Sequence, residues 1–227
     1  MFDFIQQASG TLGNSTAASE LAHKEKARIL VISDSHGNTD VVRAILQRFG
    51  MASDAVCFCG DGSRDILSVL AGSLSDADFA KCLPPVAALV QGNGDESSYS
   101  IRVANGSQTF SIPHSKLLVA AGKIIFLTHG HLYDVYYGSN ELYHAAKREK
   151  ASLALFGHTH IPYAKEEDGI LLLNPGSCAR PRRGSPNSFA VVTINPHGID
   201  YQFFSVTEAM QFEAYRPPHE EISLLWI

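Results

Sequence analysis

Short apolar runs recur along the chain, and several of them stop at a glycine or small residue beside Asp, Asn or His. The runs over residues 28–33, 55–59 and 86–90 have the composition of buried strands. Between the first two, apolar residues recur at helical spacing from Asn38, which can act as an N-cap, to Gly50. Strand, helix and strand in this order predict a right-handed βαβ unit, whose parallel strands end at one edge of a sheet.

The second half of the chain has a different pattern of apolar and polar residues. Apolar and polar residues alternate from residue 101 onward, which is typical of antiparallel strands. Two segments are helical in pattern, 65–83 with a break near Gly72 and 139–150 with Ser139 as the cap. We therefore predict an α/β fold in which a two-sheet β-sandwich is flanked by helices. The later strands are expected at residues 108–112, 116–120, 123–128, 152–156, 163–165, 170–173, 189–194 and 199–206.

The pattern divides the chain into one domain with two flanking segments. Residues 1–27 precede the first convincing strand and are expected to form an appendage, in which 15–26 has the composition of a helix. Residues 28–206 hold the predicted domain. Residues 207–227 form a tail that ends in Leu224, Leu225, Trp226 and Ile227, which must pack on this chain or on a second copy. A homodimer is one way to cover them.

Composition and charge exclude several classes of protein. A chain of 227 residues with 45% apolar content can bury a sizeable core. The 18 Lys and Arg residues against 23 Asp and Glu residues give a net charge of -5, so specific nucleic-acid binding is not expected. No apolar run is long enough to span a membrane, and no signal peptide is recognised. The four cysteines form no CxxC pair, so we predict reduced thiols and a cytoplasmic location.

The polar residues at the strand ends form a set with metal-ligand chemistry. Carboxylate, amide and imidazole donors together suit Mn²⁺, Fe²⁺ or Zn²⁺ better than Ca²⁺ or Mg²⁺. The set is too large for one ion and suits two ions about 3.5–4 Å apart with a carboxylate between them. Its members are Asp34, His36, Asp61, Asn93, His129, His158 and His160.

The order of these motifs resembles the calcineurin-like metallophosphoesterase superfamily. The resemblance rests on Asp34-Ser35-His36, Gly60-Asp61, Gly92-Asn93-Gly94-Asp95, His129 and Gly157-His158-Thr159-His160, and it covers residues 28–206. The short spacings and the Asn174-Pro175-Gly176-Ser177 element are most similar to the small single-domain bacterial and archaeal phosphodiesterases, a branch that includes a retromer subunit.

The resemblance implies a role for each matched residue. Asp34, His36 and His160 would bind the first metal, Asn93, His129 and His158 the second, and Asp61 would bridge them. The ions are expected to be Mn, with Fe, Zn or Ni as alternatives. The implied reaction is hydrolysis of a small phosphodiester by a metal-bridging hydroxide. Asn93 would lie beside the phosphoryl oxygens. Asp95 would not bind a metal itself but would interact with the residues around the metal ligands.

One residue departs from the family pattern. Many members have His, placed to protonate the leaving oxygen, where this chain has Gly94. General acid catalysis is typically worth about 10²–10⁴-fold. Either the substrate therefore has a good leaving group, or another donor such as His131 supplies the proton.

Several alternatives stay open at this point. The same site could serve a phosphomonoesterase or nucleotidase, and the same fold could be a non-catalytic protein-interaction scaffold. The arginines of the basic loop could bind phosphate or be solvated, and the tyrosines after His129 could stack on a substrate or pack structurally. These residues are Arg180, Arg182, Arg183, Tyr133, Tyr136 and Tyr137.

Overall fold

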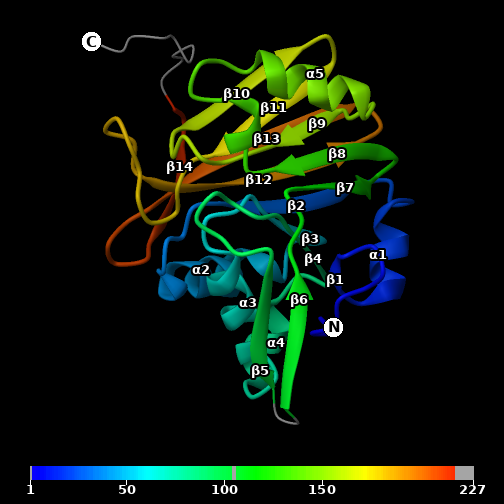
Figure 1. Cartoon of the computed structure of the whole chain (residues 1–227), viewed down its shortest axis with the longest axis vertical. Coiled ribbons are helices and arrows are strands. Elements are labelled where there is room, and N and C mark those ends of the chain that lie inside the picture. Colours follow the sequence, from blue (N-terminus) through cyan, green and yellow to red (C-terminus); the bar gives the residue numbers. More distant parts are fainter. Residues whose placement is uncertain (1, 104–105, 218–227) are drawn as a thin grey trace.

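Two β-sheets packed face to face form the centre of the molecule, with helices on both outer faces (Figure 1). This computed structural model describes residues 2–103 and 106–217. Small and branched apolar side chains fill the space between the sheets, among them Ile29, Cys57 and Ala88 from one sheet and Ile125 and Leu153 from the other. The predicted two-sheet α/β sandwich is confirmed.

The larger sheet contains the βαβ unit. Its strands β2, β3 and β4 are parallel, with Ile29 opposite Ala55 and Val56 opposite Ala87. The strands that extend it on both sides pair antiparallel. In the described part of the chain the order of strands is β1 (Leu12–Gly13), β4 (Val86–Leu89), β3 (Ala55–Phe58), β2 (Ala27–Ile32), β12 (Asn187–Asn195), β13 (Gly198–Val206) and β14 (Phe212–Tyr215).

The second sheet is built from the later strands. Its three inner strands, β11 (Ile170–Pro175), β9 (Leu153–Leu155) and β8 (Lys123–Thr128), are parallel, with Leu172 and Phe126 on either side of Ala154. Helix α5 (Asn140–Arg148) covers its outer face through Leu142, Tyr143 and Ala146. Over the described residues its order is β10 (Pro162–Glu167), β11 (Ile170–Pro175), β9 (Leu153–Leu155), β8 (Lys123–Thr128) and β7 (Ser115–Ala120).

The remaining helices lie on the outer face of the larger sheet or at its edge. Asn38 accepts a hydrogen bond from Val41 N, as its predicted capping role requires, and the helix that follows ends in one π-helical turn. The predicted break near Gly72 separates two helices. The elements are α1 (Ser15–Leu21), α2 (Thr39–Ile45), the π turn (Leu46–Gly50), α3 (Ser63–Gly72) and α4 (Ala77–Cys82), and a separate 3₁₀ turn (His131–Tyr133) follows β8 of the second sheet.

Three strands were not expected from the sequence. A hairpin of β5 (Ser98–Val103) and β6 (Gly106–Ser111) extends from the body of the molecule, and β5 was not expected although Tyr99, Ile101 and Val103 alternate with polar residues and pack on the core. The other two unexpected strands, besides β5, are β1 and β14, which are short edge strands.

The two terminal segments are packed more closely than the pattern indicates. In the segment 2–27, expected as an appendage, β1 pairs with β4, and the aromatic rings of Phe2 and Phe4 are buried in the core below the larger sheet. In the tail, β14 pairs with β13. Residues 224–227, on which the homodimer prediction rests, lie outside the described residues. Of the helices described here, none is long and apolar enough to cross a membrane.

Candidate metal centre

Five loops meet where the parallel strands of both sheets end. Asp34 and His36 follow β2, Asp61 follows β3 and Asn93 follows β4. His129 follows β8 directly, and the loop after β9 carries His158 and His160. Backbone hydrogen bonds connect neighbouring loops, from Asp34 N to Gly60 O (3.0 Å) and from Gly157 N to His129 O (3.0 Å).

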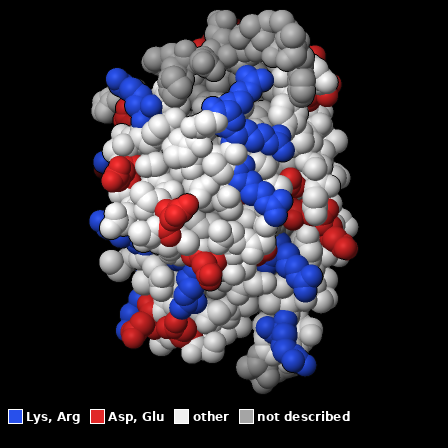
Figure 2. All heavy atoms as spheres, turned by 90° about the vertical axis from the view of Figure 1, so that its left-hand side faces the viewer, with Lys and Arg blue, Asp and Glu red and all other residues white. Residues whose placement is uncertain are grey.

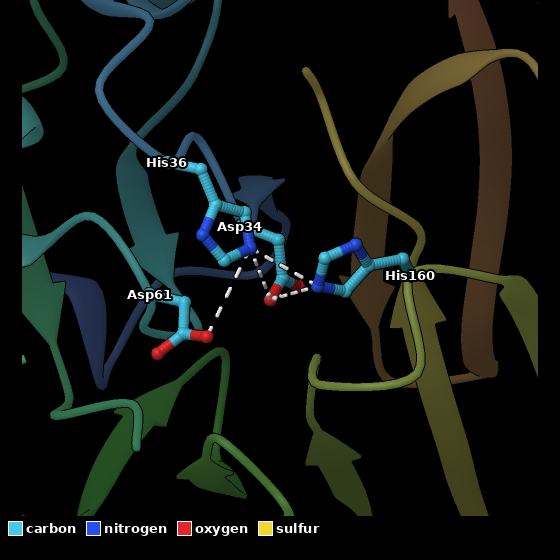
Figure 3. Close-up of side chains that lie close together, drawn as sticks. All are labelled: Asp34, His36, Asp61 and His160. Atoms are coloured by element: carbon cyan, nitrogen blue, oxygen red, sulfur yellow. Dashed lines mark hydrogen bonds and ion pairs between the residues drawn. The ribbon is translucent and has the colours of Figure 1, made fainter. Parts of the chain in front are cut away.

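Four of these side chains lie close enough to share one ion. Potential ligand atoms of Asp34, His36, Asp61 and His160 all lie within 4.8 Å of one another (Figure 3). His160 Nε2 is 3.2 Å from Asp34 Oδ1 and 3.1 Å from His36 Nε2. Two of the ligands expected for the first metal are therefore in contact with the third.

Asp61 lies between this group and a second one. Its Oδ2 atom is 3.9 Å from His36 Nε2 and 3.6 Å from His129 Nε2, and its Oδ1 atom accepts a hydrogen bond from Gly94 N (2.8 Å). His129 Nε2 lies 3.2 Å from Asn93 Oδ1. The His158 ring packs on the His129 ring with centroids 5.0 Å apart. Asp61 thus lies between the two groups of side chains.

Hydrogen bonds fix the orientation of two of the imidazoles. His160 Nδ1 is 2.5 Å from Arg180 O, and His129 Nδ1 is 2.7 Å from Cys59 O. Because a carbonyl oxygen only accepts, each Nδ1 carries the proton and donates. In the neutral ring the lone pair is then on Nε2, which faces the cluster, and this is the usual arrangement of metal-ligating histidines.

The charges within the cluster shift its titration in the metal-free protein. Burial lowers the pKa of His158 to about 4, with the neighbouring His129 acting in the same direction. Burial also lowers the pKa of His36. Burial opposes ionisation of Asp61, but the hydrogen bond and charge of His129 hold the pKa of that carboxyl well below its usual range. Asp61 is therefore an anion and His158 a neutral base at neutral pH.

An unpaired buried oxygen indicates that the cluster is suited to a cation. Asp34 is fully buried, and its Oδ2 atom accepts hydrogen bonds from Ser33 Oγ (2.6 Å) and His158 N (3.2 Å). Its Oδ1 atom has no hydrogen-bond partner, and the nearest nitrogen, His160 Nε2 at 3.2 Å, can pair with it only when that ring is protonated. A buried carboxylate oxygen without a donor is costly unless a charge compensates for it. The donor set therefore fits a divalent metal ion.

The backbone at the cluster is strained. Asp34, His36, Asp61, His158 and His160 all have positive φ angles, between 44° and 69°. Non-glycine residues rarely adopt this left-handed conformation, which costs on the order of 1–3 kcal/mol each. The strained turns follow the ends of β2, β3 and β9, where these five side chains converge.

Glycines make room for the carboxylates. A Cβ atom on Gly92 would lie 2.1 Å from Asp61 Oδ1, and one on Gly157 would lie 2.7 Å from Asp34 Oδ2. Gly94 is different, since its Cβ would lie 3.2 Å from Asp61 Oδ1 and its φ is not in the left-handed region. A side chain at position 94 would begin close to the Asp61 carboxylate.

Asp95, expected to act on the site without contacting the metals, makes its contacts with backbone and hydroxyl groups. Its carboxylate accepts hydrogen bonds from the backbone N–H groups of Gly62, Ser63 and Gly92 (each 3.0 Å), from Ser63 Oγ (2.9 Å) and from Tyr99 OH (3.3 Å). These bonds join the loop after β3 to the loop after β4. The geometry gives Asp95 a positioning role.

His131 and one of the three tyrosines border the second group. The His131 ring is 5.4 Å from the His129 ring and 6.1 Å from the His158 ring, and its Nδ1 atom is buried without a hydrogen-bond partner. Tyr136 packs on the His158 ring and donates a hydrogen bond to His158 O (2.8 Å). Tyr133 packs on Phe126, whereas Tyr137 is exposed.

Several residues support the ligand loops in ways that the sequence interpretation did not assign to them. Asn174 Nδ2 donates to Gly157 O (2.6 Å), and Ser177 Oγ donates to Asp34 O (2.7 Å), so the Asn-Pro-Gly-Ser element braces two ligand loops. Asp65 accepts hydrogen bonds from Ser35 Oγ (2.6 Å) and Gly37 N (2.7 Å). The four-residue motif marks this loop in the sequence, but nothing local predicts its partners.

Comparisons with known proteins agree with this geometry. The calcineurin-like phosphoesterase superfamily domain model matches residues 28–197. The probable metallophosphoesterase YsnB of Bacillus subtilis is 28% identical over 78% of this chain and 89% of its own. The phosphodiesterase YfcE of Escherichia coli K12 is 27% identical over 73% and 86%. The crystal structure of a predicted phosphoesterase from Streptococcus pneumoniae TIGR4 superposes with a TM-score of 0.60, 28% identity and coverage of 85% and 99%.

Proposed function

The chain belongs to the calcineurin-like phosphoesterase superfamily, and we propose that it is a metal-dependent phosphodiesterase. The observation that carries the proposal is the position of Asp61 Oδ2 between His36 and His129, beside an Asp34 oxygen that lacks a hydrogen-bond donor. Such an arrangement fits two cations that share one carboxylate.

We assign the residues to two ions as follows. Asp34, His36, Asp61 and His160 would hold one ion, and Asp61, Asn93, His129 and His158 the other. Mn²⁺ is the first ion to test, with Fe, Zn and Ni as alternatives that the same donors accept. When bound, such ions polarise a phosphoryl group and lower the pKa of water, which is the nucleophile in this proposal.

The side chains of the chain itself set the charge and orientation of the substrate. Two dications against Asp34 and Asp61 leave the centre positive, which attracts a phosphate monoanion or dianion. Asn93 turns its oxygen toward His129, so its amide NH₂ group is left to donate to a phosphoryl oxygen. Asp95 holds the loop that carries Asn93.

Protonation of the leaving oxygen falls to His131 in this proposal, because Gly94 has no side chain. Burial lowers the pKa of His131, with the His129 charge acting in the same direction. A lowered pKa makes the imidazolium a stronger acid but leaves little of it at neutral pH. We therefore expect good activity on aryl diesters and slight activity on alkyl monoesters.

A cytoplasmic location remains part of the proposal. It is supported by the four cysteines, which are free thiols, three of them buried.

Hydrolysis of bis(4-nitrophenyl) phosphate in the presence of Mn²⁺ tests the function. The protein should hydrolyse it, and Asp61→Asn should reduce the rate at least about 100-fold, since it removes the ligand common to both ions. Asp134→Asn is the matched control, because Asp134 is an exposed loop aspartate. Full activity of the Asp61 variant would refute the site assignment.

The alternatives give different results in the same assay. A phosphomonoesterase or nucleotidase would prefer 4-nitrophenyl phosphate over the diester. A scaffold would bind metal, if at all, without hydrolysing either compound. Only the diester preference supports the proposal.

A further inference from the structure

The loop between β11 and β12 carries an arginine into a cavity beside the metal centre. The cavity has a volume of about 370 Å³ and is lined by residues 35–40, Ala179 and Arg180. His36, a proposed metal ligand, is part of its wall. The volume lies within the range of about 300–1,000 Å³ that is typical of small-molecule pockets.

The backbone of Arg180 is tied to the ligand residues. Arg180 N donates to Ser177 Oγ (2.7 Å), and Arg180 O accepts the Nδ1 hydrogen of His160 (2.5 Å). Ser177 Oγ in turn donates to Asp34 O. These bonds fix the point from which the Arg180 side chain extends relative to two proposed ligands of the first metal.

The charge of Arg180 is not neutralised by an ion pair. Among the residues described, no carboxylate forms a salt bridge with its guanidinium group. The acidic residue of the cavity wall is Asp40, and Asn38 and Thr39 add neutral polar groups.

The face of the molecule onto which this loop projects carries side chains of both charges. The loop that contains Arg180 projects at the left of Figure 1, and Figure 2 looks onto this side of the molecule. Lys and Arg side chains form a column along that face, and Asp and Glu side chains lie beside it.

We propose that the Arg180 cavity binds a second phosphate group on the substrate, so that the preferred substrates are phosphodiesters that carry an additional phosphate. The inference rests on the proposed function and refines its substrate class. The planar guanidinium group matches a phosphate with two parallel hydrogen bonds, and the metal centre would hold the scissile phosphate next to it. Asp40 opposes the second phosphate by charge repulsion.

Two aryl diesters that differ only in one phosphate test this inference. Thymidine 5′-(4-nitrophenyl phosphate) and its 3′-phosphorylated derivative would be compared by kcat/KM in Mn²⁺. Because charge-assisted hydrogen bonds contribute about 1.5–3 kcal/mol, we expect the 3′-phosphorylated diester to be preferred roughly tenfold or more. Arg180→Gln should abolish this preference, whereas Asp40→Asn should increase it.

Arg148→Gln is the matched control, because it removes the same charge from an exposed position at the end of α5. It should keep the wild-type preference. Equal losses on both substrates in Arg180→Gln would overturn the inference, as would a wild-type protein without any preference.

A binding experiment separates failure of the inference from failure of the proposed function. Calorimetry in Mn²⁺ would compare thymidine 3′,5′-bisphosphate with thymidine 5′-monophosphate. Tighter binding of the bisphosphate that is lost in Arg180→Gln supports the inference even if neither diester is hydrolysed. Equal affinities, or no binding of either nucleotide, would overturn it.

Discussion

The Nε2 atoms of His36 and His160 lie 3.1 Å apart and face each other beside the unpaired oxygen of Asp34. His160 donates its Nδ1 hydrogen to Arg180 O, so its neutral ring presents a lone pair to His36. A carboxylate oxygen and two imidazole nitrogens at this spacing bring three lone pairs close together, and these lone pairs repel one another. A cation bound between the three atoms would replace this repulsion with three favourable contacts.

Metal binding should therefore stabilise the protein. Mn²⁺ at 100 times its dissociation constant adds about 2.7 kcal/mol, which for a chain of this size raises Tm by about 5–10 °C. Asp34→Asn should lose most of this increase, whereas Asp134→Asn should retain it. Thermal unfolding with and without a chelator measures both. An undiminished increase in Asp34→Asn would contradict the ligand role of Asp34.

Gly157 should not accept a side chain. A Cβ atom there would lie 2.1 Å from Ser33 Oγ and 2.7 Å from Asp34 Oδ2, so either the loop or the carboxylate must move. We expect Gly157→Ala to lower metal affinity at least about tenfold, because mutation of residues that contact and orient metal ligands typically lowers metal affinity by about 10–100-fold.

Gly198→Ala is the matched control for Gly157→Ala. Its Cβ would meet nothing within 4 Å, and its φ is not in the left-handed region. Titration with Mn²⁺ should give wild-type affinity for Gly198→Ala. Equal affinities for both variants would show that the packing around Gly157 does not position Asp34.

The sequence predicts which residues meet, but not how they are held. Asp34, Asp61 and Asn93 follow buried strands, and parallel strands share an edge, so their convergence follows from pattern alone. The left-handed backbone at Asp34, His158 and His160 is not encoded by local propensity, since it persists only when the surrounding fold enforces it. The role of Asp95 depends on donors more than 30 residues away.

The elements that were missed were missed for different reasons. In β5, Tyr99, Ile101 and Val103 alternate with polar residues in a regular strand pattern, and only the hairpin with β6 shows that the strand begins before residue 101. The aromatic residues Phe2 and Phe4 stand outside any periodic segment, and only the tertiary structure shows that they cover the core. The buried βαβ unit can be predicted because each of its strands is a continuous apolar run and its helix has apolar residues at helical spacing.

Asp95→Asn should reveal a positioning role. An amide has one acceptor oxygen in place of two, so hydrogen bonds from Gly92 N or from Gly62 N and Ser63 N must be lost. We expect the free energy of unfolding to fall by about 1–3 kcal/mol. Activity should fall without a change in the shape of its pH profile. Urea denaturation and a pH series measure the two effects, and a normal stability with an altered pH profile would instead make Asp95 a catalytic residue.

Lys116 should make stability depend on alkaline pH. This lysine of β7 is only 8% exposed, its Nζ donates to Ser9 O (2.8 Å), and burial lowers its pKa from 10.5 to about 8. Between these values the unfolded chain binds more protons than the folded one, so the free energy of unfolding should rise from pH 8 to 10.5. The full rise is about 3 kcal/mol at 1.36 kcal/mol per pH unit.

Lys116→Met provides the comparison, because it fills the same space without a charge. The stability advantage of the variant over the wild type should be largest below pH 8 and should shrink above it. Urea denaturation at a series of pH values measures this difference. Parallel stability curves for the two proteins would show that Lys116 is not responsible.

Gly94→His should change the leaving-group dependence of hydrolysis. A Cβ atom at this position would lie 3.2 Å from Asp61 Oδ1, which a shift of a few tenths of an ångström accommodates, and the side chain would extend over the bridging carboxylate. An imidazole there can protonate a leaving oxygen, which for poor leaving groups is worth about 10²–10⁴-fold. We expect the rate on an alkyl ester to rise at least about tenfold relative to the rate on an aryl ester. Gly94→Ala adds the same Cβ without a proton donor and should leave the ratio unchanged. If both variants keep the wild-type ratio, the missing side chain at position 94 is not what limits hydrolysis of esters with poor leaving groups.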